Sequence, residues 1–277
     1  MNHQYICPHW GQEHISPPDF LHKISAAGYN GIEICLPSNT DACHAFMAEI
    51  ANKFNEDPSF IFIPQLILHP QKENISQFIQ RIKKELQILV SYKPTYINSH
   101  TGKDFFSFDD NCSIIEACLE ITATTGIRIL HETHRGRFSF HAATLLPYLH
   151  KFPELELVGD FSHFCVVSES VLQNQTEIID KIIPHVSHIH ARVGFEQGPQ
   201  VNDPFAPEWQ QHLQLFTGWW QQIIDTKKKA GWQSMYITTE FGPAPYMPAL
   251  PFTQQPIGHQ WQINLALKNH LIKELKA

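Results

Sequence analysis

The feature that most constrains this chain is the recurrence, roughly every 30 residues, of a short apolar run followed by a stretch with helical periodicity. Eight such runs can be counted, at 4–7, 31–35, 60–68, 95–99, 127–132, 155–160, 186–192 and 235–240. Alternation of this kind is typical of a parallel sheet covered by helices, and eight repeats are what a closed barrel needs. We therefore predict an α/β fold, a (β/α)8 TIM barrel, as a single domain over residues 1–277.

Helix signals separate the strands. Ser16 followed by two prolines is typical of a helix N-terminus, and Gly28 is a suitable stop for that helix. Further helices are expected over about 40–54, 75–89, 109–125 and 258–276. A long irregular stretch, at about 194–207, follows the seventh strand before a helix that contains Trp219 and Trp220.

Charge, hydropathy and cysteine spacing exclude several classes of protein. The net charge of −7 argues against a nucleic-acid partner, which normally meets a basic face. No apolar run approaches the roughly 18–20 residues of a membrane span, and no signal peptide is visible. Six cysteines without a CxxC pair indicate reduced thiols. We expect a cytoplasmic protein with no membrane or nucleic-acid partner, and leave open whether it forms a homo-oligomer.

The period of two within each strand identifies the side chains that face the barrel axis. In the seventh strand Ile189 and Ala191 are apolar and point outward, which leaves His188, His190 and Arg192 inward. The same reasoning gives the last inward residue of strands four to eight as His100, Glu132, Asp160, His190 and Glu240. In such barrels the active site lies at the carboxyl ends of the strands, where these five residues meet.

A group of carboxylates at one barrel mouth indicates a metal site. A lone carboxylate or histidine at a strand end more often is solvated or hydrogen-bonded in the wall. Three carboxylates together would repel each other by on the order of several kcal/mol unless a cation lies between them. Oxygen and imidazole ligands suit manganese, cobalt, magnesium or zinc. The sequence therefore predicts one divalent ion at this mouth.

Six segments carry a resemblance to a known family: 28–33 (GYNGIE), 98–102 (NSHTG), 131–137 (HETHRGR), 159–163 (GDFSH), 188–192 (HIHAR) and 239–243 (TEFGP). With them the chain resembles the xylose isomerase-like TIM-barrel superfamily, which includes sugar phosphate isomerases and epimerases and the AP endonucleases. The pattern spans essentially the whole chain. An Asp-x-x-His pair, followed by a strand-end His and a strand-end Glu, is fairly specific to this superfamily.

The resemblance implies roles for individual residues. It implies a metal, manganese as the first choice and cobalt, magnesium or zinc as alternatives, held by Glu132, Asp160, His190 and Glu240. It implies that Glu132 and Glu240 also shuttle the proton, and that His163 and Arg192 contact the substrate. We expect further substrate contacts from His100, His69 and Trp10. The two histidines could equally hold a second metal, and Trp10, like Glu33, could be a structural wall.

Two departures from the family pattern bear on the function. The AP endonucleases bind further metal through an Asp-x-His, whereas Asp203 is followed here by Pro204 and Phe205. His134, Arg135 and Arg137 do not belong to the epimerase pattern. They would place positive charge at the mouth, which suits an acidic sugar, although partnership with nearby carboxylates explains the arginines equally well.

The function expected first is a metal-dependent isomerase or epimerase of a small sugar or polyhydroxylated carbonyl compound, a small-molecule carbohydrate substrate. A metal-dependent dehydratase of a cyclic polyol ketone is the main alternative, since it begins with the same proton abstraction. Net charge disfavours an AP endonuclease, and the intact ligand set disfavours a non-catalytic sugar-binding barrel. No glycine-rich phosphate cradle is evident, which favours a substrate without phosphate.

Overall fold

A computed structural model describes residues 1–276, and in that part of the chain eight parallel strands close into a barrel in sequence order. The strands are β1 (Asn2–Pro8), β2 (Gly31–Ile34), β3 (Ile61–Leu66), β4 (Ile97–Ser99), β5 (Ile129–Glu132), β6 (Leu157–Gly159), β7 (Val186–Ala191) and β8 (Ser234–Thr239). Each strand pairs with the next, and β8 pairs with β1. The predicted (β/α)8 barrel is confirmed.

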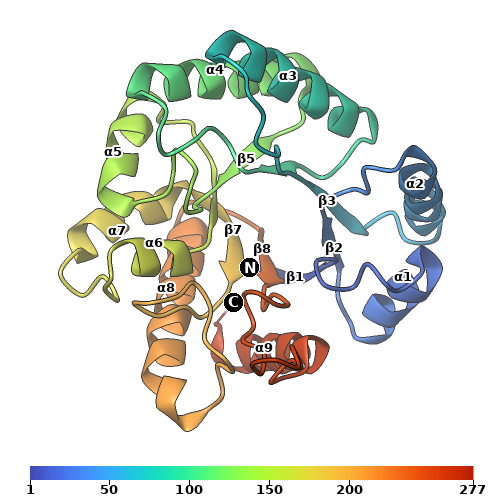
Figure 1. The fold of residues 1–277 in the computed structure, drawn as a ribbon, viewed down its shortest axis with the longest axis vertical. Coiled ribbons are helices and arrows are strands. Elements are labelled where there is room, and N and C mark those ends of the chain that lie inside the picture. Colours follow the sequence, from blue (N-terminus) through green and yellow to red (C-terminus); the bar gives the residue numbers. More distant parts are fainter. Residues whose placement is uncertain (277) are drawn as a thin grey trace.

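Helices surround the barrel on all sides (Figure 1). They are α1 (Pro17–Ala26), α2 (Thr40–Glu56), α3 (Ile75–Ser91), α4 (Phe108–Thr125), α5 (Ala142–Lys151), α6 (Ser162–Val167), α7 (Thr176–Ile182), α8 (Gln210–Lys229) and α9 (Gln260–Glu274). The side chain of Ser16 accepts a hydrogen bond from the Asp19 backbone, as its predicted role as the N-cap of α1 requires. Such a cap contributes about 1 kcal/mol to helix stability.

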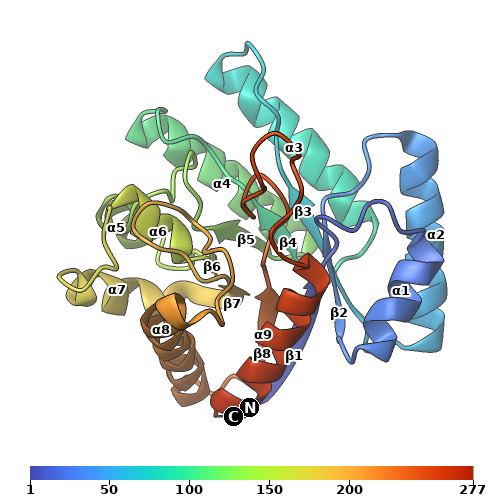
Figure 2. The same ribbon diagram turned by 60° about the horizontal axis from the view of Figure 1, so that its bottom comes forward.

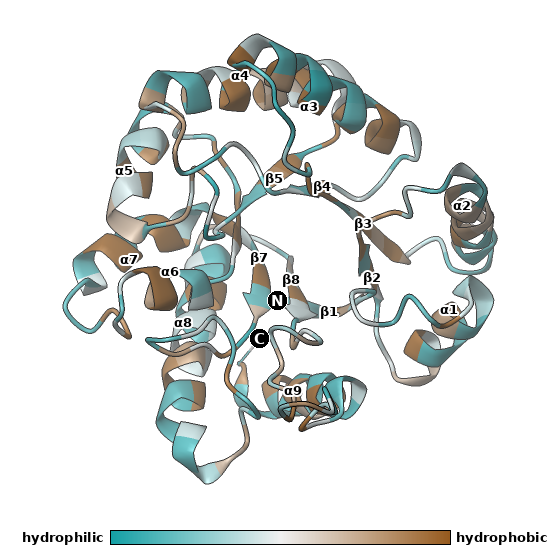
Figure 3. Cartoon of the chain, viewed as in Figure 1, coloured by the Kyte–Doolittle hydropathy of each residue, from teal (hydrophilic) through white to brown (hydrophobic). Residues whose placement is uncertain are grey.

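Apolar side chains fill two separate regions, one between the strands and the helices and one inside the barrel. Figure 3 shows that helices such as α3 and α4 have hydrophobic and hydrophilic faces, and that β3 is hydrophobic whereas β7 carries hydrophilic segments. The inner region consists of Ile6, Ile61, Ile63, Tyr96, Leu130 and Val158, with Tyr236 packed against them. Because this plug fills much of the barrel interior, the polar inward residues of the candidate site lie toward the carboxyl ends of the strands.

Several strands are shorter than the sequence suggests, most clearly the third. The predicted run 60–68 ends as a strand at Leu66, where it pairs with Ser99. Leu68 is still buried, but it packs with α3 and α4 and not within the sheet. The apolar run extends beyond the strand because the residues after Leu66 pack against helices. Hydropathy alone cannot distinguish residues buried in the sheet from residues buried against helices.

The first and last strands close the barrel along a long seam. Their register runs from Asn2↔Ser234 to Ile6↔Thr238. Figure 2 shows α9 running beside this seam and the segment between β8 and α9 rising at the opposite end of the barrel from the N and C labels. No helix within residues 1–276 combines the length and the apolar character that crossing a membrane requires. All six cysteines are free thiols.

Candidate metal centre

The four predicted metal ligands lie together at the carboxyl ends of β5 to β8. Asp160, His190 and Glu240 each offer a ligand atom, and these atoms all lie within 4.8 Å of one another. Glu132 lies within the same range of Asp160. From Nδ1 of His190 the distance is 2.5 Å to Oε2 of Glu240 and 3.8 Å to Oε2 of Glu132. All four side chains are buried.

Two of these atoms are available to an ion. Nδ1 of His190 and Oε2 of Glu240 are both buried and make no hydrogen bond, although they face each other as an ion pair. Buried polar atoms without a hydrogen bond are rare in proteins, and an ion is one of the recognised explanations. One imidazole nitrogen and three carboxylates form a donor set that suits manganese, zinc or magnesium. We therefore find that the residues present fit a divalent cation.

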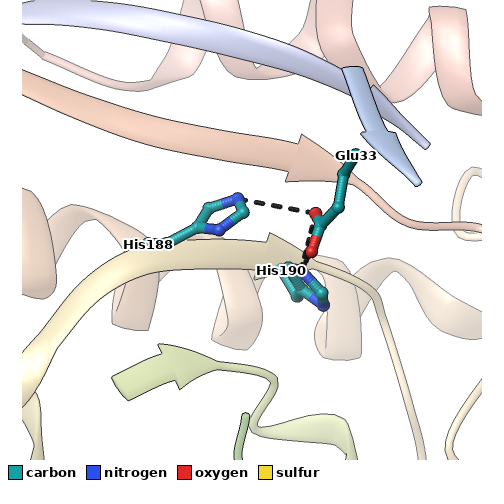
Figure 4. A group of neighbouring side chains, drawn as sticks. All are labelled: Glu33, His188 and His190. Atoms are coloured by element: carbon teal, nitrogen blue, oxygen red, sulfur yellow. Dashed lines mark hydrogen bonds and ion pairs between the residues drawn. The ribbon is translucent and has the colours of Figure 1, made fainter. Parts of the chain in front are cut away.

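Glu33 fixes the orientation of His190. Its Oε2 lies 2.9 Å from Nε2 of His190, and Figure 4 shows both His190 and His188 of β7 turned toward this carboxylate of β2. A histidine that donates its Nε2 proton to a carboxylate keeps the lone pair of Nδ1 available for a metal. Metal-binding histidines usually make such a second contact to a carboxylate. Nδ1 is the nitrogen that faces Glu240. The ring is thus held with its ligand atom toward the carboxylates.

Glu33 also accepts hydrogen bonds from side chains of two other strands, β8 and β4. Thr238 donates to it at 2.6 Å, and the Asn98 amide donates at 2.8 Å. The same Asn98 nitrogen lies 2.7 Å from Oε2 of Glu132, so it links Glu33 to the metal centre. From the sequence, Glu33 was expected either to line the floor of the pocket or to be a structural wall residue. The alternation of Ile32 and Ile34 around it was the signal that it faces inward.

Charges in the site set the protonation of each carboxylate. Burial raises the pKa of Glu33, but His190 and His188 outweigh it and lower that pKa to about 2. Burial likewise opposes ionisation of Glu132, yet His100 and His190 hold its pKa well below the usual range. The pKa of Asp160 is raised to about 6, because burial there exceeds the effect of Arg192. Glu33 and Glu132 are therefore ionised at neutral pH.

Arg192 supplies part of the positive charge that the sequence argument assigned wholly to a metal. Its Nε lies 2.9 Å from Asp160, and its Nη2 lies 2.8 Å from Glu240. The guanidinium also lies 5.4 Å from the Trp10 ring centre and 4.8 Å from that of Tyr246. Arg192 was predicted to contact the substrate. In the structure its guanidinium binds these two carboxylates.

A cavity of about 300 Å³ opens above the metal centre, at the low end of the range for small-molecule sites. Trp10, His100, Glu132, Arg192 and Glu240 line this cavity, together with Tyr246 from the segment after β8. Tyr246 was not predicted, because loops carry no periodicity that places a side chain. Trp10 packs directly over Gly242, where any Cβ would collide with the indole ring, so glycine is required there.

His69 does not lie in this cavity, contrary to the prediction that it contacts the substrate. It is exposed and lines a neighbouring groove with His44, Arg81 and Tyr92. This groove shares Cys35, Gln65 and Ile67 with the cavity. The reason is the early end of β3 at Leu66, which places His69 in the loop beyond the sheet. His69 is therefore not part of the candidate metal centre.

Three histidine rings pack together, tilted with respect to each other, beside Glu132. Nε2 of His100 lies 2.9 Å from Oε2 of Glu132, and the His134 ring lies between those of His100 and His163, at 4.5 and 3.9 Å. His163 is fully buried, with Nε2 3.6 Å from Asp160 and neither ring nitrogen hydrogen-bonded. Burial lowers the pKa of His134 to about 3 and that of His163 well below its usual value, so both are neutral. His100, Glu132 and His134 form another group able to hold a metal.

The additional site of the AP endonucleases is not formed. Phe205, in place of their histidine, packs against the His270 ring at 5.7 Å. Among the groups within residues 1–276 that could hold a metal, none includes Asp203.

The chain is similar in sequence and in fold to known proteins. The sequence profile described as "Xylose isomerase-like TIM barrel" matches residues 21–255. No curated protein sequence matches at a significant level. The probable 3-DHS dehydratase AsbF from Bacillus anthracis is 16% identical, with a TM-score of 0.64 over 97% of this chain and 98% of that one. The 3-keto-D-glucoside 4-epimerase YcjR from E. coli is 12% identical, with a TM-score of 0.60 over 98% and 100%. The IolI protein with a bound zinc atom is 12% identical, with a TM-score of 0.60 over 98% of each chain. At such identities the likeness concerns the fold.

Proposed function

The chain belongs to the xylose isomerase-like TIM-barrel family, and on that premise we propose that it is a metal-dependent isomerase or epimerase of a small sugar or polyhydroxylated carbonyl compound. The observation that carries the proposal is the pair Glu132 and Glu240, which both line the cavity and both approach Nδ1 of His190. The solved structures similar to this chain include an epimerase and a protein with bound zinc, which supports the same assignment.

The two glutamates reach the cavity from different directions. Glu132 ends β5, whereas Glu240 follows β8, and β6 and β7 lie between these strands in the barrel. A divalent ion held by Glu132, Asp160, His190 and Glu240 would polarise a substrate carbonyl and its neighbouring hydroxyl, which acidifies the C–H bond between them. One glutamate then accepts that proton and the other returns a proton to the opposite face or to the neighbouring carbon.

Neighbouring side chains prepare the two glutamates for this exchange. His100 and His190 keep the pKa of Glu132 low, so its carboxylate is ionised and able to accept a proton. Arg192 binds Oε1 of Glu240 and leaves Oε2 without a hydrogen bond. Removing a positioned general base lowers a rate by about 10²–10⁴-fold, which is the scale of contribution asked of each glutamate.

A dehydratase is the second candidate function. The likeness to AsbF favours it, and the first step, removal of the proton next to the carbonyl, is the same. The reactions diverge afterwards, since a dehydratase expels a β-hydroxyl as water while an epimerase retains every oxygen.

Turnover in D2O tests the proposal and separates the two reactions. The metal-loaded protein is incubated with D-fructose, D-psicose, D-tagatose, L-sorbose, scyllo-inosose and 3-dehydroshikimate, and products are followed by NMR. We expect deuterium on the carbon next to the carbonyl with all oxygens retained, and loss of this incorporation in Glu132→Gln and Glu240→Gln. The metal content of each variant is measured alongside.

Product formed without deuterium would rule out the proton shuttle, because a direct hydride shift moves the hydrogen without exchange. Deuterium uptake accompanied by loss of water would favour the dehydratase.

A further inference from the structure

Arg137 is a positively charged residue of the cavity wall whose guanidinium has no hydrogen-bond or ion-pair partner in the described part of the chain. It lines the cavity beside Glu132 and His134. Within residues 1–276 its guanidinium makes no hydrogen bond and no ion pair, and its Nε is buried without a partner. Arg192, which lines the same cavity, is instead fully engaged by Asp160 and Glu240. The guanidinium of Arg137 is therefore available to a ligand, whereas that of Arg192 is already paired with two carboxylates.

The backbone of the segment that carries Arg137 is anchored, which fixes the point from which the side chain extends. Gly136 adopts the left-handed φ of 76°, which permits the turn closed by the bond from the Arg137 backbone to the His134 carbonyl. Phe138 is buried, and its backbone N–H binds the Thr101 carbonyl. Ser139 donates to the carbonyl of Glu132 itself. The base of the Arg137 side chain is thus fixed relative to a proposed catalytic residue.

Burial without a partner is unfavourable for a guanidinium. The buried Nε–H of Arg137 has lost its contact with water and gains no acceptor from the described part of the protein. Burial lowers the pKa of Arg137, with Glu132 opposing the effect, but an arginine remains charged at neutral pH. A partly buried, charged and unpaired fork at a small-molecule cavity is complementary to an anionic group on the ligand.

We propose that Arg137 binds a carboxylate of the substrate, so that the polyhydroxylated carbonyl compound turned over here is a sugar acid or a comparable hydroxylated keto acid. This rests on the proposed function for the identity of the reaction, while the anion contact stands on the cavity alone. The planar guanidinium fork matches the two oxygens of a carboxylate. One unpaired cation also matches a single negative charge, whereas phosphate sites commonly add backbone N–H groups at a helix N-terminus.

Binding of matched pairs tests the proposal without requiring turnover. Calorimetry with the manganese-loaded full chain compares D-glucuronate with D-glucose, D-galacturonate with D-galactose, and D-gluconate with D-glucitol. We expect at least one acid to bind about tenfold or more tighter than its neutral parent, the scale of a charge-assisted hydrogen-bond pair. In Arg137→Gln the preference should fall to within about twofold. Arg137→Lys, which keeps the charge but loses the fork, should be intermediate.

Arg135→Gln is the matched control. Arg135 is exposed, lies two residues earlier and does not line the cavity, so its loss removes one positive charge near the mouth without touching the proposed contact. The acid preference should remain unchanged in this variant. Thermal melts of all three variants establish that they are folded.

Three results would overturn the proposal. They are the absence of any acid preference in the native protein, a preference that persists in Arg137→Gln, and tighter Arg137-dependent binding of D-glucose 6-phosphate than of D-glucuronate. Acid binding that depends on Arg137 but is accompanied by no deuterium exchange would instead refute the proposed function and leave the anion contact standing. Exchange with neutral ketoses and no acid preference would do the reverse.

Discussion

Glu33 and Glu240 are both buried glutamates on either side of one imidazole, and they differ in how completely they are hydrogen-bonded. Glu33 receives donors from four side chains, His190, Thr238, Asn98 and Gln65. Glu240 pairs with Arg192 through Oε1, and its Oε2 forms an ion pair with Nδ1 of His190 but makes no hydrogen bond. The first carboxylate is fully occupied within the protein, whereas the second retains coordinating capacity.

This difference teaches which carboxylate positions and which reacts. A carboxylate whose acceptor sites are filled stabilises its surroundings and orients the imidazole, as Glu33 does through Nε2 of His190. A carboxylate with an unused oxygen in a cavity can bind an ion or take up a proton, as proposed for Glu240. The number of hydrogen bonds therefore distinguishes Glu33 from Glu240, although both are buried glutamates.

The largest effect is expected from Glu240→Gln. The amide keeps the shape of the side chain but cannot accept a proton, so turnover should fall by about 10²–10⁴-fold or more. Steady-state kinetics on whichever substrate shows deuterium exchange measures it, with metal content determined in parallel. Activity within tenfold of the native protein would erase the distinction between the two glutamates.

Metal removal should have the next largest effect. The protein is expected to bind close to one divalent ion per chain, and EDTA should remove both the ion and the activity. Adding Mn²⁺ at about 100 times its dissociation constant should stabilise the fold by about 2.7 kcal/mol. For a chain of this size that shifts Tm upward by about 5 °C. Elemental analysis without metal, together with no thermal shift, would show that the unsaturated oxygen of Glu240 is not a ligand.

Glu33→Gln should lower the metal affinity, although Glu33 is not one of the proposed ligands. The amide presents donors where Glu33 now only accepts, so it loosens the hold on Nε2 of His190. Metal affinity should fall by about 10–100-fold, the usual effect of losing the partner of a ligand histidine. Titration of the EDTA-treated protein with Mn²⁺ measures this. Glu196→Gln, at a partly exposed carboxylate that also pairs with a histidine, His212, is the control and should leave affinity unchanged.

The smallest effect is expected from His69→Ala. His69 is exposed and lies outside the cavity, so neither carboxylate depends on it. Stability should change by no more than about 0.5 kcal/mol, and kcat/KM should stay within twofold. A large loss of metal or activity would mean that the groove around His69 communicates with the metal centre.

Much of the barrel and its polar end could be predicted because strands have a strict period. In β7 the alternation of Ile189 and Ala191 with His188 and His190 places both histidines inward, and both face Glu33. Helix signals were equally local, as the cap at Ser16 shows. The predicted roles of Glu132 and Glu240 in catalysis remain predictions.

The rest depends on contacts between segments distant in the sequence. Glu33 is a positioning residue only because β2 and β7 face each other across the barrel, which no local pattern reveals. The placement of His69 relied on a strand end, and such ends are hidden when the following residues pack on helices, as Leu68 does. Arg192 was expected to face a substrate, but its pairing with Asp160 and Glu240 depends on side-chain reach that spacing does not encode.

The seam between β1 and β8 also orders events during synthesis. Trp10 follows the first strand and Tyr246 the last, and their rings meet edge to face at 5.0 Å above Arg192. A ribosome releases Trp10 early, yet Glu240 and Tyr246 emerge only when most of the chain has been made. No partly synthesised barrel can therefore complete this cavity or the full ligand set. A ligand that requires them can stabilise only the closed molecule, so it acts on the last stage of folding and leaves earlier stages unaided.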